Sequence, residues 1–540
     1  MTIARFLNYT PFEATPMRIQ LIHPPTHVAP GNLQTPRPTQ PLGLAYVAAA
    51  LRSAGHDCVV LDALGEAPTQ MVPGEPLVRL GLTDEQILHR IDPKAAAIGI
   101  TNMFSFNWPA LRSLIHAIRA RYPDQIIVCG GEHFTALPEL SMRTAPIDYI
   151  VMGEGEGVAT ELFAKLGSGT PFDAAQIMGI CWRRGEEIVK NPRAERTRAV
   201  DEIPWPAWDL FDMDSYNRHD LVGGLRFGDR TMPILATRGC PYQCTYCASP
   251  QMWTTRWYAR DPVDVANEIE FYAQRYHANN FPFQDLTMIV KKDWVVRFCN
   301  EIMRRGLDIR WQLPTGTRCE VVDDEVATLL WRSGCRWLCY APESGSDRTR
   351  ELIKKKLKMS SLLQAVAASV RANLQLQAYM VIGFPHDTRD DLNDTLKLAR
   401  RLARMGVEDI AVNFFFPVPS TELWTYLQDK GRLRLSDEAL TAPAFGHTKT
   451  LKPARHYCEH VSCEELTRWK YRIVANFYLT AWLWHPRRVF RIAHNAMKGK
   501  QTTALEKFLS DSKLRLARKL GWKSGPHGAQ RSGTGPVLPY

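Results

Sequence analysis

Three closely spaced cysteines constrain this chain more than any other feature of its sequence. Cys240, Cys244 and Cys247 follow one another with the spacing C-x3-C-x2-C. They come directly after an apolar run at residues 232–236 that predicts a buried strand. A strand that leads into a tight Gly-Cys-Pro loop brings three thiols to one point. Thiolates are the ligands that iron–sulfur clusters require, and three of them leave one iron of a four-iron cluster open to substrate or cofactor.

Two other interpretations of these cysteines compete with the cluster. A structural zinc site takes four ligands, and no second cysteine pair or Cys/His knuckle lies near this loop in the sequence. A disulfide with one spare thiol suits a secreted protein. The first residues have no long apolar core, so we expect neither export nor a membrane anchor. Twelve cysteines in such a chain favour a reducing cytoplasm.

The stretch at residues 236–250 resembles the cluster loop of radical S-adenosylmethionine (SAM) enzymes. The resemblance implies a [4Fe–4S] cluster whose open iron binds the amino and carboxylate groups of SAM. Electron transfer from the cluster then splits SAM into methionine and a 5′-deoxyadenosyl radical. It also implies an external electron donor of the flavodoxin or ferredoxin type. The protein's part in such chemistry is positioning, redox tuning and the exclusion of water.

Short apolar strands alternate with helices between residues 17 and 185, after a short extension at residues 1–16. The strands are expected at residues 18–23, 58–62, 95–100, 125–129 and 148–152. This pattern predicts a Rossmann-like, doubly wound parallel sheet, which binds ligands at the carboxyl ends of its strands. Two glycine clusters follow strands there and let a ligand approach the backbone. They comprise Gly130, Gly131, Glu132 and His133, and then Gly153, Glu154, Gly155 and Glu156.

A dinucleotide site is the rival interpretation of the second glycine cluster. The cluster does not have the spacing G-x-G-x-x-G, and its two carboxylates would repel a pyrophosphate. The sheet and both turns resemble instead the cobalamin-binding domain that precedes many radical SAM enzymes. The resemblance implies that these turns line the slot for cobalamin. Residues 62–65 lie nearest to the Asp-x-His-x-x-Gly position of other cobalamin proteins and contain no histidine, so the axial ligand stays unassigned. A sheet that has lost its cofactor is the alternative.

A linker at residues 186–230, with a Pro-Trp-Pro stretch, leads to a second α/β unit at residues 231–430. Six strands are expected there, at residues 232–236, 281–286, 311–316, 337–343, 375–383 and 410–416. Six such units are similar to the incomplete (β/α)6 barrel of the radical SAM family. Working residues of barrels lie at the carboxyl ends of the strands.

The family resemblance implies five residues that contact SAM. Tyr246 matches the residue whose backbone lies near the adenine, and Asp285 matches an acidic residue close to the amino group. Glu343 and Ser344 belong to a turn that faces the ribose and the carboxylate. Gly383 belongs to an apolar turn beside the adenine. Taken singly, each acidic residue would more often be a salt-bridge partner within the barrel, but their order behind the cysteine loop favours the SAM interpretation.

Gln284 and the nine remaining cysteines also bear on the candidate sites. Gln284 departs from the family pattern, because relatives often carry a second acid at this position. The nine remaining cysteines lie mostly in apolar stretches and are expected to be buried. Two of them, Cys458 and Cys463, lie near His456 and His460, which leaves a second metal site open without assigning it.

The C-terminal region at residues 431–524 is predicted to be helical and, after residue 485, basic. Residues 485–540 hold twelve Lys and Arg against two Asp and Glu, a net +10 within a total of +11. The rest of the chain is therefore almost neutral, which argues against nucleic acid as a partner. The apolar run at residues 473–484 is shorter than the about 20 residues that span a bilayer. Residues 525–540, rich in Gly, Pro and Ser, are predicted to be a disordered tail.

Two interpretations of the basic helices stay open. Aromatic residues beside Arg487, Arg488 and Arg491 fit a helix that lies on an anionic membrane surface. The later stretch adds leucines and basic residues, namely Leu505, Leu509, Leu514, Leu516, Leu520, Lys507, Lys513, Arg515, Arg518 and Lys519. A helix whose aromatic face caps the barrel core shows the same pattern.

Both resemblances together predict a cytoplasmic, cobalamin-dependent radical SAM enzyme. The membrane interpretation of the basic helices adds association at a membrane surface. The favoured reaction is methylation of an unactivated carbon of a small hydrophobic or natural-product substrate. A non-methylating enzyme resembling the anaerobic cyclase of chlorophyll synthesis is the alternative within the enzyme class. A non-catalytic iron–sulfur or cobalamin sensor is the alternative from another class, and the SAM-facing turns argue against it. No catalytic side chain is assigned.

Overall fold

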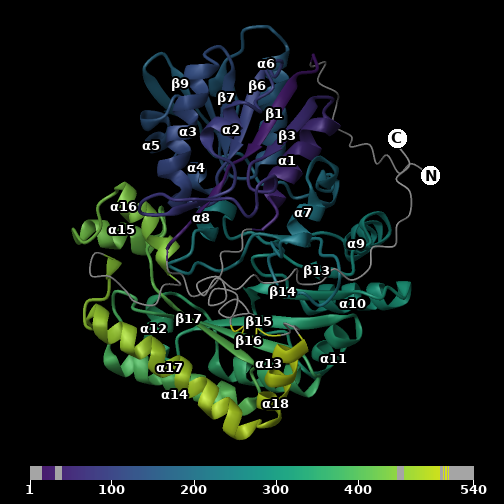
Figure 1. Cartoon of the computed structure of the whole chain (residues 1–540), viewed down its shortest axis with the longest axis vertical. Helices are drawn as coiled ribbons and strands as arrows, with labels where there is room; N and C mark the ends of the chain where they lie inside the picture. The colour runs from purple at the N-terminus through teal and green to yellow at the C-terminus, as the bar shows by residue number, and fades with distance from the viewer. Residues whose placement is uncertain are drawn as a thin grey trace.

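The structure is a computed structural model that describes residues 15–30, 39–446 and 455–498, together with residues 503, 505, 506 and 509. Two α/β halves follow one another along the long axis of the molecule (Figure 1). The N-terminal half, purple to blue, lies at the top, and the barrel half, green, lies below it. Most of the predicted extension, all of the predicted tail and the basic residues from Lys513 to Lys519 lie outside the described residues.

The N-terminal half is built on a sheet of order β10-β9-β8-β7-β6-β1-β3. Five neighbouring strands are parallel: β3 (Asp57–Asp62), β1 (Arg18–His23), β6 (Ala97–Thr101), β7 (Ile126–Gly130) and β8 (Tyr149–Val151). Numbered along the chain, their order is the flavodoxin-like 2-1-3-4-5, so the predicted doubly wound sheet is confirmed. An antiparallel hairpin, β9 (Ile180–Arg184) and β10 (Glu187–Lys190), extends this sheet beyond the prediction.

Helices fill the connections of this half. They are α1 (Leu42–Ser53), α2 (Asp84–Leu88), α3 (Trp108–Arg121), α4 (Glu132–Ala136), α5 (Pro138–Thr144) and α6 (Gly155–Gly167). Helices α1 and α6 pack against each other. A small antiparallel sheet of β2 (Thr26–Val28), β5 (Val78–Leu80) and β4 (Met71–Val72) was not predicted. The linker helix α7 (Met213–Arg218) buries Tyr216 beside Leu64 and Leu80, so it fastens the linker to this half.

The barrel half contains five parallel strands in chain order. They are β13 (Asn280–Pro282), β14 (Arg310–Thr317), β15 (Cys335–Glu343), β16 (Gln375–Ile382) and β17 (Asp409–Phe414). Residues 231–236 occupy a sixth position, where Thr231 and Ile234 form isolated parallel bridges to Asn280 and Phe283. The continuous strand expected there does not form, since Pro233 has no N–H to donate. The six positions confirm the predicted partial barrel.

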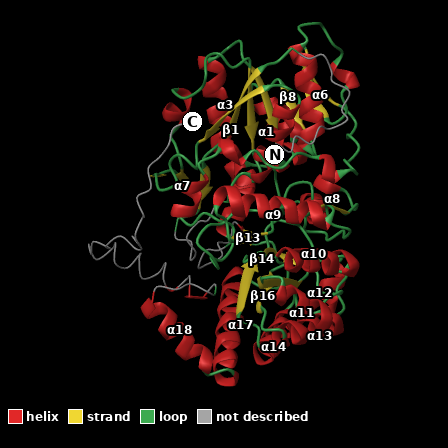
Figure 2. Ribbon diagram, turned by 90° about the vertical axis from the view of Figure 1, so that its right-hand side faces the viewer, coloured by secondary structure: helices red, strands yellow, loops and turns green. Residues whose placement is uncertain are grey.

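Helices α9 (Pro262–Tyr276), α10 (Lys292–Arg305), α11 (Asp324–Arg332), α13 (Met359–Arg371) and α14 (Arg389–Met405) connect the barrel strands. Helix α15 (Glu422–Asp429) follows the last barrel strand. The described part of the C-terminal region is helical, as predicted, with α16 (Asp437–Thr441), α17 (Cys463–Trp484) and α18 (Arg487–Lys498). Helix α17 packs on α14 and β17, and Figure 2 shows it alongside the barrel strands, with α18 projecting from its end. None of the described helices combines the length and apolar character needed to cross a membrane.

Segments that follow the barrel also reach back to the N-terminal half. Helix α16 lies against α3 and the short turn η1 (Ser105–Asn107). Arg112 on α3 pairs with Asp437 on α16, with 2.7 Å between Nη2 and Oδ2. The Ser420 hydroxyl donates a hydrogen bond of 2.6 Å to the Ala136 carbonyl. The two halves therefore touch through the C-terminal region as well as through the linker.

Candidate active site

The three cysteines lie on the loop between β11 (Thr237–Arg238) and α8 (Ser249–Trp253). Their side chains are partly exposed, whereas the other nine cysteines are buried. Backbone bonds fix the loop, because Thr245 donates to the Ile353 carbonyl and accepts from Leu423. Burial raises the pKa of the Cys240 and Cys244 thiols, and the neighbouring Cys247 charge adds to the effect. All three thiols come from this one short loop.

This donor set fits an iron–sulfur cluster better than a single ion. No group of three His, Cys, Asp or Glu side chains in the described part of the chain could hold a metal ion. A four-iron cluster has different demands, since each thiolate binds its own iron. At the second metal site that the sequence left open, the side chains form hydrogen bonds instead. His456 Nε2 lies 2.6 Å from the Val461 carbonyl, and Cys458 Sγ contacts the Asp387 carbonyl at 3.2 Å.

Glu343 stands at the centre of a buried polar group beside the cysteine loop. It ends β15 with a φ of 65°, in the left-handed region. Its Oε1 accepts hydrogen bonds from the Tyr246 hydroxyl at 2.9 Å and from Lys355 Nζ at 3.0 Å. Burial opposes the charge on Lys355, but the Glu343 carboxylate outweighs it and raises the lysine pKa. Lys355 was not predicted from the sequence, because a run of three lysines is typical of an exposed loop.

The turn after β16 packs against the same loop. Gly383 has a φ of 83°, and a Cβ there would lie 2.9 Å from Leu466 Cδ1. Asp387 Oδ2 accepts from the backbone N–H groups of Gly383 and Phe384 at 2.9 and 3.1 Å. The Phe384 ring lies 5.5 Å from the Tyr246 ring. The predicted SAM residues Tyr246, Glu343 and Gly383 thus lie in one region.

Two other predicted SAM residues form hydrogen bonds within the protein. Ser344 Oγ lies 3.1 Å from Thr395 Oγ1. Asp285 accepts from Thr237 N and Oγ1 at 2.6 Å and from Ala236 N at 3.2 Å, and burial raises its pKa to about 6. These bonds hold the segment that leads into the cysteine loop. The contact of Asp285 and Ser344 with SAM stays a prediction.

The first glycine cluster adjoins an orphaned amide. Gly131 has a φ of 109°, and a Cβ there would lie 2.7 Å from the Asn102 carbonyl oxygen. Neither side-chain amide atom of Asn102 has a hydrogen-bond partner, although the residue is buried. An unsatisfied buried amide costs about 1–3 kcal/mol, so this position fits a ligand with polar groups of its own. Met103 and Phe104 follow at the same strand end with 60% and 49% exposure.

Of the two polar residues after Gly131, His133 is buried and Glu132 is half-buried. His133 Nδ1 lies 2.9 Å from Ser105 Oγ, its Nε2 lies 3.4 Å from Ser141 Oγ, and its ring stacks on Trp108. Burial lowers the pKa of His133 to about 3 and raises the pKa of Glu132 to about 6. His133 is therefore a neutral histidine within the core. A contact of either side chain with cobalamin stays a prediction.

The second glycine cluster contacts the barrel half and the linker through its carboxylates. Glu156 Oε1 lies 2.6 Å from Arg238 Nη2, and Glu154 Oε1 lies 3.1 Å from Arg196 Nη2. Burial opposes the charge of Glu156, but Arg238 lowers its pKa overall. Gly153 N donates to Thr135 Oγ1 at 2.9 Å. No periodicity or motif marked either arginine in the sequence.

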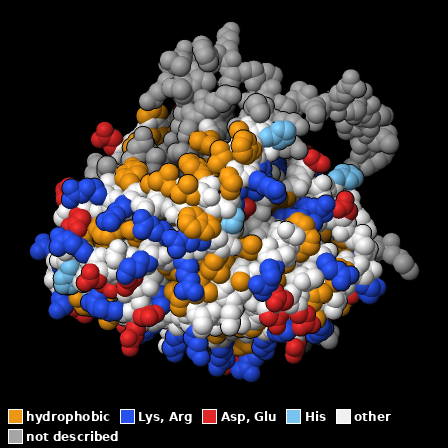
Figure 3. All heavy atoms as spheres, turned by 90° about the horizontal axis from the view of Figure 1, so that it is seen from below, with side chains coloured by type: hydrophobic (Ala, Val, Ile, Leu, Met, Phe, Trp, Pro, Cys, Tyr) orange, Lys and Arg blue, Asp and Glu red, His pale blue; other side chains and the backbone are white. Residues whose placement is uncertain are grey.

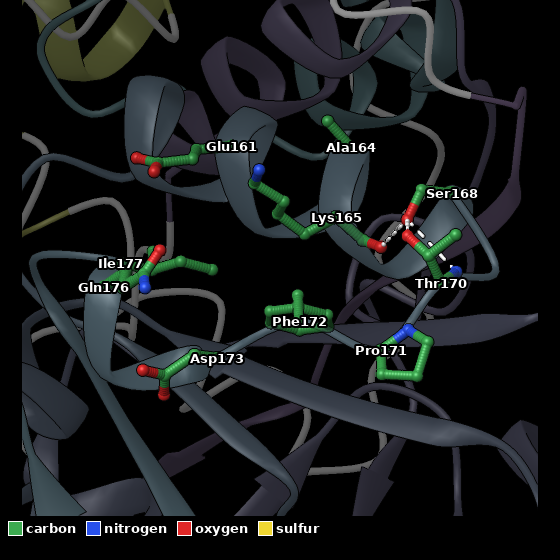
Figure 4. Close-up of a pocket in the computed structure, with 10 residues that line it drawn as sticks. All are labelled: Glu161, Ala164, Lys165, Ser168, Thr170, Pro171, Phe172, Asp173, Gln176 and Ile177. Carbon is green, nitrogen blue, oxygen red and sulfur yellow. Dashed lines mark hydrogen bonds between the residues drawn. The ribbon is translucent and has the colours of Figure 1, made fainter.

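A surface pocket lies away from all of these residues. Figure 4 shows it between α6 and the turn η2 (Ala174–Gln176), with Lys165, Phe172 and Asp173 among its lining residues. None of the predicted site residues lines it. We therefore place the candidate active site at the cysteine loop and the facing strand ends of the N-terminal half.

A flavodoxin-like sheet followed by a partial parallel barrel with a three-thiol loop defines a cluster-bearing enzyme with a cofactor domain in front. Comparison with known families agrees. Residues 33–163 match the B12 binding domain, and residues 234–399 match the radical SAM superfamily. The chain belongs to the radical SAM enzymes that carry an N-terminal B12-binding domain. Its cofactors are therefore a [4Fe–4S] cluster, SAM and cobalamin, and such enzymes act on small molecules with an external reductant.

Three relatives are informative. An uncharacterised methyltransferase of Pyrococcus horikoshii is 28% identical, over 86% of this chain and 93% of its own length. The anaerobic magnesium-protoporphyrin IX monomethyl ester cyclase of Synechocystis is 29% identical, over 71% of this chain and 72% of the cyclase. The solved structure of the radical SAM methyltransferase TsrM from Kitasatospora setae, with cobalamin and a [4Fe–4S] cluster bound, has a TM-score of 0.61 at 18% identity. It covers 78% of this chain and 80% of TsrM, which establishes the shared fold.

Proposed function

We propose that this chain is a cobalamin-dependent methyltransferase that methylates an unactivated carbon of a small hydrophobic or natural-product substrate. The observation that carries the proposal is the buried contact between the B12-binding turn and the cysteine loop, made by Glu156 and Arg238. Such a contact brings the two cofactor-binding parts next to each other. The Pyrococcus relative, named as a methyltransferase, supports the same reaction class.

In this proposal Cys240, Cys244 and Cys247 hold the cluster. When bound, the cluster and SAM supply the 5′-deoxyadenosyl radical that removes a hydrogen atom, and cobalamin supplies the methyl group. Glu343, paired with Lys355, orients the polar groups of SAM, while the rings of Tyr246 and Phe384 exclude water beside it.

Asn102 and the backbone at Gly130 and Gly131 receive cobalamin at the strand ends of the N-terminal half. Cobalt receives no histidine from this chain in this proposal. The electron donor is a flavodoxin or ferredoxin, and the enzyme works in the cytoplasm.

A non-methylating cyclase reaction is the second candidate, since the Synechocystis cyclase shares both halves of the chain. The experiment that separates the two needs no knowledge of the substrate. The protein is reconstituted anaerobically with iron, sulfide and cobalamin, reduced, and given SAM with a deuterated methyl group.

The methyltransferase proposal predicts S-adenosylhomocysteine together with transfer of the labelled methyl group to cobalamin. 5′-Deoxyadenosine without S-adenosylhomocysteine would support the cyclase-like candidate. Changing Cys240, Cys244 and Cys247 together to Ala is expected to remove the cluster and 5′-deoxyadenosine formation. Full iron content in that variant would contradict the cluster assignment.

We also propose that the lower end of the molecule lies on an anionic membrane surface. Residues 471–498 contain no Asp or Glu, and Leu483, Trp484 and Phe490 are 75%, 55% and 74% exposed. Seen from below, hydrophobic side chains gather there among Lys and Arg (Figure 3). A hydrophobic substrate would reach the enzyme from such a surface.

The barrel-capping interpretation of α17 also holds for its opposite face, where Ile473, Phe477 and Ala481 are buried. Arg488 and Arg491 are engaged within the protein, since both pair with Glu408. The positive charge offered to a surface therefore comes from residues such as Arg487, which is exposed.

A further inference from the structure

Arg238 is placed to link the two cofactor-binding parts. It ends β11, two residues before Cys240, so it belongs to the barrel half and leads directly into the cysteine loop. Its side chain contacts the N-terminal half. Nη2 pairs with Glu156 at 2.6 Å, Nη1 lies 3.7 Å from Glu154, and Cζ lies 4.8 Å from the centre of the Tyr46 ring. The Arg238 side chain is 6% exposed.

Glu154 makes a second link, to the other end of the same loop. Its Oε1 lies 3.1 Å from Arg196 Nη2. The Arg196 guanidinium donates to the Trp253 carbonyl at 2.7 Å and lies over the Trp253 ring. Trp253 ends α8, the helix that follows Cys247. The turn at residues 153–156 is thus linked to both ends of the cysteine loop. It contacts Arg238 before Cys240, and through Arg196 it is linked to Trp253 after Cys247.

Buried ion pairs of this kind contribute more to geometry than to stability. Two ions lose their hydration on burial, and their attraction repays this loss only in a good geometry. An apolar contact would hold the two halves together, but the hydrophobic effect is non-directional. The guanidinium instead has fixed N–H directions, so it accepts carboxylates only in particular positions.

We propose that Arg238 is a positioning residue that sets the distance and orientation of the cysteine loop relative to the B12-binding turn. The inference rests on the proposed function, in which SAM bound at this loop serves both radical formation and methyl transfer to cobalamin. Arg238 touches neither reacting group and acts through Glu154 and Glu156. Loss of the Arg238 side chain changes the ratio between radical formation and methyl transfer from SAM. It does not only lower the amount of folded protein.

The test uses a variant that leaves no carboxylate unpaired. Arg238→Met with Glu156→Gln removes the Arg238–Glu156 pair and leaves Glu154 with Arg196. The matched control is Arg305→Met with Glu270→Gln on the outer helices. Arg305 also pairs with two carboxylates, at 2.7 Å from Glu270 and 2.8 Å from Glu301, and the control leaves Glu301 with Arg304.

The first readout does not depend on turnover. The reduced cluster and cob(II)alamin each carry an unpaired electron, so pulsed EPR measures the dipolar coupling between them. We expect one narrow coupling in the wild type and in the control, and a shifted or broadened coupling in the Arg238 variant. An unchanged coupling overturns the proposal. If the double variant does not load iron, Glu156→Gln alone provides the same comparison with the same two outcomes.

The second readout is the ratio of S-adenosylhomocysteine to 5′-deoxyadenosine formed from SAM. The proposal predicts at least a tenfold change in this ratio for the Arg238 variant and an unchanged ratio for the control. A purely structural role would lower both products in proportion to the folded fraction, and that result contradicts the proposal. Failure of the proposed function has a different signature, because the wild type itself would then form no S-adenosylhomocysteine.

Discussion

Lysines 354 and 355 show how little sequence proximity says about the role of a charged residue. Lys355 Nζ binds Glu343 in a pair whose side chains are 10% and 9% exposed. Lys354 Nζ binds Glu422 in a pair whose side chains are 49% and 58% exposed. The two neighbouring lysines therefore lie in opposite surroundings, one buried and the other exposed. Only Lys355 belongs to the candidate site.

This difference leads to a prediction at the residue scale. Lys355→Met leaves the Glu343 carboxylate buried without its cation, and we expect a loss of about 3–5 kcal/mol in the free energy of unfolding. The control, Lys354→Met, breaks a surface pair and is expected to cost less than about 1 kcal/mol. Urea unfolding of both variants measures the difference. Equal losses would show that the Glu343–Lys355 pair is not a buried pair in solution.

Asp387 gives the protein a dependence of stability on pH. Burial raises its pKa to about 7, whereas an unfolded aspartate titrates near about 3.9. As the pH rises, Asp387 therefore loses its proton at a lower pH in the unfolded chain than in the folded protein. Between about pH 4 and pH 7 the contribution of Asp387 to stability falls, by at most about 1.4 kcal/mol per pH unit.

Asp387→Asn is expected to remove the contribution of this residue to the fall in stability with rising pH. The asparagine can still accept from Gly383 N and Phe384 N, and its amide can donate to the Thr349 hydroxyl that now donates to Asp387. The measurement is urea unfolding at several pH values between 4 and 8, with the exposed Asp390→Asn as control. The slope for Asp387→Asn should be smaller than for the wild type and for the control. Identical slopes would contradict the pKa assignment.

At the scale of elements, the turn after β15 depends on close packing against α14. A Cβ on Gly345 would lie 2.2 Å from the Asp394 carbonyl oxygen and 2.7 Å from Thr395 Cα, and neither backbone atom can rotate away. Gly345→Ala is therefore expected to cost at least about 1–3 kcal/mol in the free energy of unfolding. It should also weaken SAM binding, since it moves Glu343 and Ser344.

The control for this prediction is Gly43→Ala in α1, where a Cβ would meet nothing within 4 Å. This change is expected to be neutral or to stabilise the protein by up to about 1 kcal/mol, because alanine favours the helix. Thermal unfolding and equilibrium dialysis with SAM compare the two variants. Full stability of the Gly345 variant would mean that α14 does not pack on this turn as described.

The elements themselves could largely be predicted from the sequence. Short apolar runs such as residues 18–23 coincide with a strand, because buried parallel strands need apolar side chains on both faces. Pairing between distant polar side chains could not be predicted. Arg238 and Glu156 are separated by 82 positions, and neither belongs to a periodic pattern. The orphaned amide of Asn102 carries no sequence signal either, since only the fold shows that it is buried.

At the scale of the whole molecule, the lower end offers an apolar face bordered by positive charge. We expect the protein to float with liposomes that contain anionic lipid at low salt and to dissociate at high salt. Changing Leu483 and Phe490 together to Ser should abolish flotation. The control is Leu435→Ser, because Leu435 is 40% exposed but lies elsewhere on the molecule. Flotation unaffected by the double change, or no flotation at low salt, would exclude this surface as the contact.

The contacts that residues 420–437 make with α3 and Ala136 also matter while the chain is being synthesised. The strands of the N-terminal sheet are all present once residue 190 has left the ribosome, but Ser420 and Asp437 follow roughly 10 to 50 seconds later at about 5–20 residues per second. Throughout that interval α3 and the turn η1 lack their contacts with α16. The nascent N-terminal half must therefore stay soluble without these contacts, and chaperones or cobalamin itself can reach this side of it before the ribosome releases the chain.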